Sequence, residues 1–192
     1  MNRLPFIRFC LAVATAPLTL LSKFSHGNQK LADKKGFMVA SNKDRFNKPL
    51  SVYGGDTFFT KISTGDTDGR LFIFESTRDK EGGPPLHYHF DQDEWWYVVS
   101  GEFLIKVGEE TYHAKAGDSV YGPRMVPHTF AKIGEGEARI ILLFQPAGKM
   151  EDFFKAVAEG SVGKMSDAER DSFREAHGFK HVGPPLKQLK KP

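Results

Sequence analysis

The stretch "PPLHYHFDQDEWWYVVSGE", residues 84–102, places two histidines and a glutamate beside an aromatic-rich segment. Side chains two positions apart in a β-strand share a face, so His87 and His89 would point the same way, whereas on a helix they would diverge. The two prolines upstream argue against a helix, and "WWYVV" is typical of a strand that begins at Glu94. Two imidazoles and a carboxylate on adjacent strands predict a site for a first-row transition metal.

A fourth ligand is expected some thirty residues further on. His128 opens the strand-like segment "HTFAKIG" directly after the turn-rich "GDSVYGPRMVP". His113, His177 and His181 have no comparable partners in the sequence, and we interpret them as surface histidines.

Short apolar runs separated by turns surround these residues. Gly- and Asp-rich breaks such as "GDTDG" and "AGD" tolerate tight reversals of the chain. Many short strands with no helical period between them predict an all-β sandwich or barrel over residues 51–146. The strand candidates are 57–63, 70–76, 94–100, 102–108, 110–116, 119–123, 128–134 and 138–144.

Helical periodicity follows this region. "KMEDFFKAVAEG" (149–160) places apolar side chains on one face and ends in glycine. Ser166 to Glu169 form a capping box that opens a second helix, which continues to Gly178. We therefore expect residues 147–192 to form a helical C-terminal extension with two short helices.

The first 27 residues are predicted to be a signal peptide. Two arginines precede an apolar run over residues 9–21, which is too short to span a bilayer but fits a signal-peptide core. Cleavage near Gly27 would make the protein secreted or periplasmic. The alternatives are an uncleaved membrane anchor or a retained N-terminal helix, and a leader that does not function would leave the protein in the cytoplasm.

Composition narrows the class of protein further. The formal net charge is only +3, and no segment interleaves aromatics with Lys and Arg, so we expect no nucleic-acid binding. The single cysteine, Cys10, lies in the predicted leader, so a cleaved chain would have no disulfide or thiol chemistry. Residues 28–50 are polar and are expected to form an extended arm.

The two clusters of residues resemble the motifs of the cupin family. The first family motif runs Gly, spacer, His-x-His, three or four residues, Glu, six residues, Gly, and it is matched by His87, His89, Glu94 and Gly101. The glycines before His87 lie closer to it than the usual five-residue gap.

The second family motif runs Gly, five residues, Pro-x-Gly, two residues, His, three residues, Asn. Gly117, Pro123 and His128 match it, while Met125 replaces the second glycine and Lys132 replaces the asparagine. The resemblance covers about residues 50–146 and implies a double-stranded β-helix, the cupin jelly-roll barrel. It also implies one divalent transition metal (Fe, Mn, Ni, Cu or Zn) inside one mouth, held by His87, His89, Glu94 and His128.

The chain resembles, more loosely, bacterial single-domain cupins related to quercetin 2,3-dioxygenase. That resemblance implies a metal-dependent dioxygenase that acts with O₂ on a small phenolic or enolisable substrate, with Glu94 as both ligand and general base. A non-oxidative cupin (an isomerase, an epimerase, or a metal- or sugar-binding module) is the alternative, and a jelly-roll without metal is a third. Because cupins commonly pair by sheet extension, a homodimer is expected.

Strand alternation identifies candidates for a substrate-binding wall. Counting from Glu94 and His128 in steps of two places Trp96 and Phe130 on the metal side. These two aromatics would suit a flat apolar substrate, and the alternative for both is core packing.

Overall fold

The computed structural model describes residues 35–186, and from Met38 onward these residues form one compact unit. The predicted signal peptide, residues 1–27, lies outside the described residues. Residues 35–49 of the predicted arm contain no strand or helix. In the described part of the chain, no helix is both long enough and apolar enough to cross a membrane.

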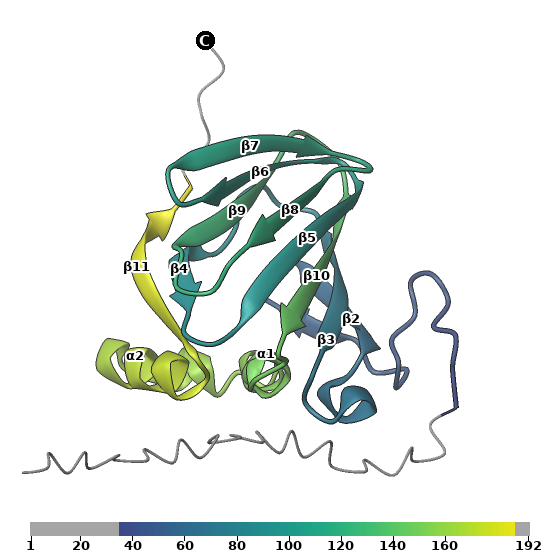
Figure 1. The fold of residues 1–192 in the computed structure, drawn as a ribbon, viewed down its shortest axis with the longest axis horizontal. Helices are drawn as coiled ribbons and strands as arrows, with labels where there is room; N and C mark the ends of the chain where they lie inside the picture. The colour runs from purple at the N-terminus through teal and green to yellow at the C-terminus, as the bar shows by residue number, and fades with distance from the viewer. Residues whose placement is uncertain (1–34, 187–192) are drawn as a thin grey trace, which may run out of the picture. The chain divides into compact units, whose positions relative to one another are not determined.

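Two antiparallel sheets face one another (Figure 1). One sheet has six strands in the order β1-β2-β3-β10-β5-β8, and the other has five in the order β11-β4-β9-β6-β7. The strands are β1 (Leu50–Val52), β2 (Asp56–Ile62), β3 (Phe72–Arg78), β4 (Pro85–His89), β5 (Asp93–Ser100), β6 (Glu102–Val107), β7 (Glu110–Lys115), β8 (Ser119–Gly122), β9 (His128–Ile133), β10 (Ala138–Gln145) and β11 (Phe179–Pro185).

This arrangement confirms the predicted all-β jelly-roll, with one difference in detail. The two sheets remain separate, so they pack as a sandwich and are not closed into a barrel by hydrogen-bonded strands of the described residues. Alternation along each strand fills the space between the sheets; in β10 the inward residues are Ala138, Ile140, Leu142 and Phe144, all fully buried.

Gly101 explains why the first motif needs a glycine between β5 and β6. Its φ is +77°, and a Cβ there would lie 2.5 Å from the Cβ of Ala138. No other residue fits both the left-handed backbone and the contact with β10. The tight turn keeps β5 and β6 adjacent in the chain while they belong to different sheets.

Both expected helices are present. They are α1 (Met150–Ala158) and α2 (Asp167–Ala176), accompanied by short 3₁₀ turns η1 (Thr64–Thr67) and η2 (Val162–Lys164). The predicted capping box is confirmed. The Ser166 hydroxyl accepts from the Glu169 backbone N–H, and the Glu169 carboxylate accepts from the Ser166 backbone N–H. Figure 1 shows the two helices beside each other at one end of the sandwich.

Two strands were not expected from the sequence. β1 has three residues, too few for a visible alternation. β11 contains Gly183, Pro184 and Pro185, which read as an irregular tail, but it is the edge strand beside β4. Proline has no backbone N–H to donate. It is tolerated in an edge strand because the N–H groups on the open side of that strand have no ladder partner. The C-terminal extension therefore adds a strand to the jelly-roll as well as two helices.

Met125 stands where the second motif has glycine, and its backbone adopts the left-handed conformation with φ +63°. Its side chain is 58% exposed, so little packing would be lost on truncation. We expect Met125→Gly to raise the free energy of unfolding by about 0.5–1 kcal/mol, because the strain outweighs the entropy of glycine. Urea denaturation measures the change.

Met165→Gly is the matched control, since Met165 has an ordinary φ of −77°. This control should lower the stability. An equal loss of stability in both variants would show that Met125 is not strained.

Candidate metal centre

Four buried side chains from three strands converge between the sheets. His87 and His89 lie on β4, His128 lies on β9 directly opposite His87, and Glu94 comes from β5 in the other sheet. One ligand atom from each of the four lies within 4.8 Å of the others. The structure therefore brings together the four residues that the sequence predicted as metal ligands.

The Glu94 carboxylate is the point of convergence. Its Oε2 atom lies 3.1 Å from Nε2 of His128, 3.2 Å from Nε2 of His89 and 3.9 Å from Nε2 of His87. A fully buried carboxylate is costly unless positive charge or donated protons surround it. The three imidazoles are placed where a cation shared with Glu94 would contact all four groups.

Backbone carbonyls fix the tautomers of two of these rings. Nδ1 of His87 lies 2.8 Å from the Pro85 oxygen, and Nδ1 of His128 lies 2.9 Å from the Val126 oxygen. A carbonyl oxygen only accepts, so Nδ1 donates in each case and a neutral ring presents the Nε2 lone pair toward Glu94. Two acceptors facing each other repel, so the arrangement calls for a proton or a metal ion between them.

The surroundings of His89 give the strongest evidence that a metal ion fits these four residues. It is completely buried, and neither ring nitrogen has a hydrogen-bond partner. Although Nε2 lies 3.2 Å from Glu94, the pair is not aligned as a hydrogen bond. A buried unpartnered polar group of this kind costs about 1–3 kcal/mol, and a metal ion bound at Nε2 would remove part of that cost. The donor set fits a divalent transition metal.

The protonation states follow from the same contacts. Burial alone would raise the pKa of Glu94, but the imidazoles of His128 and His89 outweigh it and hold that pKa below its usual range. Burial, together with the charges of His128 and His89, lowers the pKa of His87 well below that of a free histidine. An ionised carboxylate and a neutral imidazole are the forms that bind metals. A lowered pKa also makes Glu94 a weaker base, so its role as general base stays a prediction.

Trp96 packs against His128, one of the four candidate ligands. Its ring meets His128 edge-on with centroids 5.2 Å apart, and it is completely buried. Gly122 on β8 allows this packing, because a Cβ there would lie 2.6 Å from the Trp96 ring and 3.4 Å from Nδ1 of His128. Trp96 points inward, as the alternation indicates, and packs against His128; it is not among the residues that line the cavity described next.

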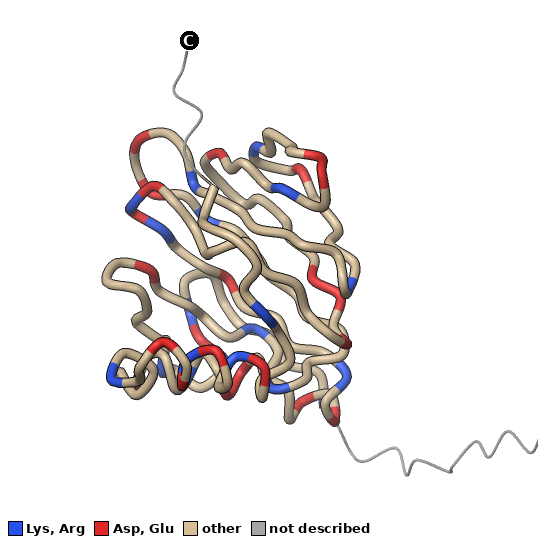
Figure 2. The backbone as a smooth tube through the Cα atoms, turned by 90° about the vertical axis from the view of Figure 1, so that its left-hand side faces the viewer, with Lys and Arg blue, Asp and Glu red and all other residues tan. Residues whose placement is uncertain are grey.

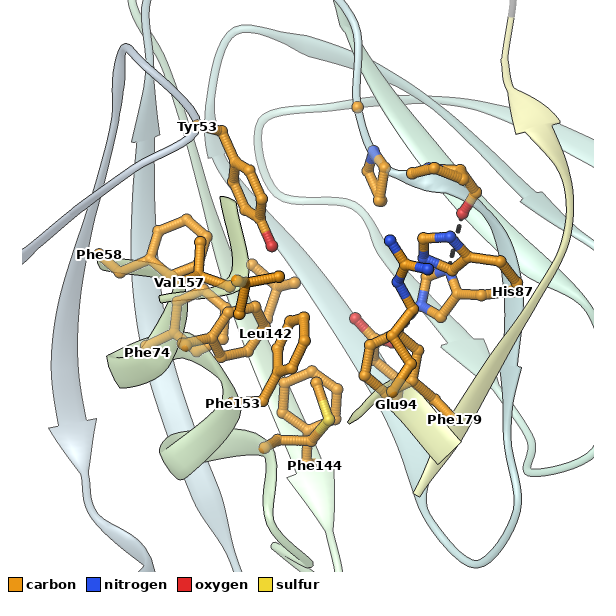
Figure 3. Close-up of a pocket in the computed structure, with 18 of the residues that line it drawn as sticks. Tyr53, Phe58, Phe74, His87, Glu94, Leu142, Phe144, Phe153, Val157 and Phe179 are labelled. Atoms are coloured by element: carbon orange, nitrogen blue, oxygen red, sulfur yellow. Dashed lines mark hydrogen bonds and ion pairs between the residues drawn. The ribbon is translucent and has the colours of Figure 1, made fainter. Parts of the chain in front are cut away.

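A cavity of about 490 Å³ opens beside the four ligands. His87 and Glu94 form part of its wall, and Figure 3 shows them across the cavity from a group of phenylalanines. The lining phenylalanines of β2, β3, β10, β11 and α1 are Phe58, Phe74, Phe144, Phe153, Phe154 and Phe179. Phe130, which the sequence indicated, also lines the cavity, and its contact with a substrate stays a prediction.

The turn between β4 and β5 fixes both ends of the segment that covers this cavity. Gln92 donates to the Ala147 oxygen (2.8 Å), just before α1, and the Phe90 N–H donates to the Gly178 oxygen (2.9 Å), just after α2. Glu151 of α1 accepts from the backbone of η1 (2.7 Å). The turn that separates the His-x-His pair from Glu94 therefore also positions the two helices.

Among the other histidines, His113 agrees with the interpretation as a surface residue, whereas His177 is half-buried against Phe153 and Phe173. His113 is exposed and pairs with Glu102, and His177 bonds the Phe173 oxygen at the end of α2. His181 was wrongly interpreted as a surface residue: it lies on β11 and lines the cavity. The error follows from missing β11.

Sequence reasoning also missed Arg78. It lines the cavity from the end of β3, and its guanidinium lies 5.1 Å from the centroid of the Phe130 ring. A signal was available, because Phe72, Phe74 and Ser76 alternate inward and place Arg78 on the same face.

Comparison with known proteins agrees with this geometry. Residues 74–144 match the family described as Cupin domain. The chain contains a cupin domain. This segment begins on β3, ends on β10 and includes all four candidate ligands.

Sequence relatives cover only part of the chain. It is 30% identical to the polyketide synthase CurC of Streptomyces cyaneus over 104 residues, which cover 52% of this chain and 64% of that protein. It is 31% identical to an uncharacterized protein of Methanocaldococcus jannaschii over 67 residues, 35% of this chain and 54% of the other. The chain thus spans between half and two thirds of the length of these relatives.

Solved structures show the same fold. KdgF from Halomonas sp. superposes with a TM-score of 0.50 at 21% identity, covering 58% of this chain and 94% of that one. A predicted oxalate decarboxylase from Thermotoga maritima gives a TM-score of 0.50 at 16% identity, covering 57% and 99%. At these identities the likeness concerns the fold alone.

The metal assignment is tested by changing His89. Protein purified without added metal should hold a stoichiometric divalent transition metal, and His89→Ala should abolish it, as measured by elemental analysis. His113→Ala, an exposed histidine, should leave the metal content unchanged. His89→Ala protein that keeps stoichiometric metal would contradict the assignment.

Gly122→Ala tests how the site is supported. The added Cβ would clash with the Trp96 ring that packs on His128, so we expect a loss of about 1–3 kcal/mol in unfolding free energy and metal affinity weakened by about tenfold or more. Gly55→Ala is the control, because its Cβ would make only an ordinary 3.5 Å contact with Lys80. Titration with a chromophoric chelator and thermal unfolding provide the two readouts. Equal effects at both glycines would show that Trp96 does not position His128.

Proposed function

We propose that this cupin is a metal-dependent oxygenase that acts on a small phenolic or enolisable compound. The observation that carries the proposal is a group of three imidazoles and one carboxylate of which two members, His87 and Glu94, form part of the wall of an aromatic cavity. A metal-binding group deep in the protein core would serve only stability, whereas His87 and Glu94 both face the cavity. A molecule in the cavity therefore reaches the candidate metal centre directly.

The ligands would be His87, His89, Glu94 and His128 around one Fe, Mn, Ni, Cu or Zn ion. When bound, the metal supplies Lewis acidity and positions substrate and O₂ together. Glu94 is the protein group placed to take the proton of a substrate hydroxyl, since it is the carboxylate in the cavity wall. His87 and His128 keep their Nε2 atoms directed at that point through their carbonyl hydrogen bonds.

The cavity walls favour an aromatic or otherwise flat substrate. Phenylalanines of β2, β3 and β10 in the six-stranded sheet and of α1 line it, and Phe130 and Phe179 line it from the five-stranded sheet. Aromatic rings pack on such walls in offset or edge-on contacts. The helices over the cavity would exclude water from the reacting atoms, which suits chemistry on an enolate or phenolate.

A second candidate is a non-oxidative reaction on a similar compound. The polyketide synthase CurC, which is similar over 104 residues, favours it, because its name places a relative in polyketide synthesis. Polyketide intermediates are enolisable and become phenolic, so the two proposals share a substrate class. They differ in whether O₂ is consumed.

Oxygen uptake decides between the two. Metal-loaded protein, incubated with a panel of flavonols and related enediols, should consume O₂ in proportion to substrate, and EDTA should abolish the uptake. Glu94→Gln should reduce turnover by about 10²–10⁴-fold if Glu94 moves the proton. Anaerobic turnover would favour the non-oxidative reaction, and metal-loaded protein inert to the whole panel would contradict the oxygenase.

Export and assembly are proposed from the sequence and the family. The leader-like residues 1–27 support a secreted or periplasmic protein, and mass spectrometry of protein from cell fractions would show a mature terminus near residue 28. A homodimer through a sheet edge is proposed by resemblance to other cupins, and light scattering on purified protein would show twice the mass of the chain. An intact leader in the cytoplasmic fraction, or a monomer, would contradict these proposals.

A further inference from the structure

We propose that the cavity binds a carboxylic acid, with Arg78 and Arg174 holding the carboxylate and the phenylalanine wall holding an aromatic body. The inference rests on the proposed function, in that the cavity is taken as the substrate site. It adds the chemical class of the substrate, which the metal ligands do not specify. Three groups of observations support it, namely the buried arginine of β3, the arginines of α2 and the charges that line the cavity.

Arg78 is a buried cation with an unused donor. It is only 8% exposed and forms an ion pair with Asp56 through Nη2 (2.8 Å). Its Nε atom is buried and has no hydrogen-bond partner. The guanidinium also lies over the Phe130 ring, so its plane is held in one orientation in the cavity wall. Arg78 lines the cavity, and a hydrogen-bond acceptor would remove the cost of burying its unpartnered Nε–H.

Two more arginines reach the cavity from the helix that covers it. Arg170 and Arg174 are one turn apart on α2 and therefore share a face, and both line the cavity. Each pairs with an aspartate three residues earlier, Asp167 and Asp171, which are themselves exposed. Figure 2 shows this alternation of acidic and basic positions along the helices at the end of the sandwich.

Arg174 is the better placed of the two. Its side chain is 17% exposed, against 32% for Arg170, and Nη1 bonds Asp171 at 2.7 Å. An arginine has five N–H donors in a planar fork, so one bond to an exposed partner leaves donors for a second acceptor.

Tyr53 lines the same cavity as the arginines of β3 and α2. Figure 3 shows its hydroxyl turned toward the cavity, although the residue as a whole is exposed. Arg78 and Arg174 line the same cavity from β3 and α2. An anionic group in the cavity would be attracted by both guanidinium groups.

The arginines that line the cavity have their carboxylate partners outside its lining, because Asp56, Asp167 and Asp171 do not line it. Three arginines line it, and among the described lining residues Glu94 is the carboxylate. The Glu94 charge is already directed at the imidazoles, so it does not neutralise the arginines. The apolar walls leave this positive charge weakly screened, which favours an anion. A carboxylate matches the planar fork of arginine with two parallel hydrogen bonds.

Binding of a matched pair of probes tests the assignment. We would titrate 2-naphthoate and the neutral 2-naphthamide into the full chain by calorimetry, with the protein zinc-loaded and, separately, EDTA-treated. The acid should bind at least about tenfold more tightly than the amide in both forms, because its charge-assisted bonds come from arginine. The metal-free arm is needed because a carboxylate could also bind the metal.

Variants assign the preference to residues. Arg174→Gln should remove most of the acid preference, by about tenfold, and Arg78→Lys should weaken it while keeping the charge beside Asp56. Arg70→Gln is the control, since Arg70 lies outside the cavity with its side chain 67% exposed and pairs with Asp68. If circular dichroism shows that Arg78→Lys does not fold, the acid preference is measured with Arg174→Gln and Arg170→Gln instead.

Three results would overturn the inference. They are equal affinity for acid and amide, an acid preference that survives the changes at Arg78 and Arg174, and a preference that exists only with zinc. The proposed function fails separately. An acid preference in metal-free protein without any metal-dependent turnover would leave the carboxylate site standing and remove the oxygenase.

Discussion

The buried carboxylate of Glu94 among three imidazoles is the constraint on which this structure depends. Glu94 comes from the six-stranded sheet, while His87, His89 and His128 come from the five-stranded sheet, so their interaction joins the two sheets at one point. The fixed tautomers of His87 and His128 turn lone pairs toward a second acceptor, and neither ring nitrogen of His89 has a hydrogen-bond partner. Such a group lowers its free energy on binding a cation, and its charge of one carboxylate suits a divalent ion.

The rest of the site follows from where that group lies. The connection between β4 and β5 carries the chain from the His-x-His pair to Glu94 and also bonds both ends of the helical segment through Gln92 and Phe90. The helices consequently cover a cavity whose wall contains His87 and Glu94. One short turn thus relates the ligands, the change of sheet and the covering of the cavity. The hydrogen bonds of this turn therefore help to hold a polar site inside an apolar core.

Much of the fold could be predicted from the sequence because its signals are local. Alternation and Gly- or Asp-rich turns located the strands from β2 to β10, and the capping box at Ser166 located α2. The four ligands could be predicted because a period of two places His87 and His89 together and the family motifs relate them to Glu94 and His128. Met125 is instructive, since it departs from the motif in residue type while keeping the left-handed backbone of a glycine.

The features that could not be predicted from the sequence depend on contacts between residues that are far apart in the chain. β11 has the prolines of a tail and becomes a strand only because β4 offers it an edge, and His181 reaches the cavity only through that pairing. Trp96 points inward as the alternation indicates, but whether it meets a substrate or His128 depends on Gly122, twenty-six positions away and on another strand. Arg78 and Arg174 lie almost a hundred residues apart, and no local pattern connects them.

Anomalous X-ray diffraction at the absorption edge of the metal found in the purified protein tests the central claim most directly. The account predicts one strong peak at bonding distance, about 2.0–2.2 Å, from Nε2 of His87, His89 and His128 and from a carboxylate oxygen of Glu94. A metal bound elsewhere on the chain, or protein that holds no metal at these four residues after metal is supplied, would contradict it.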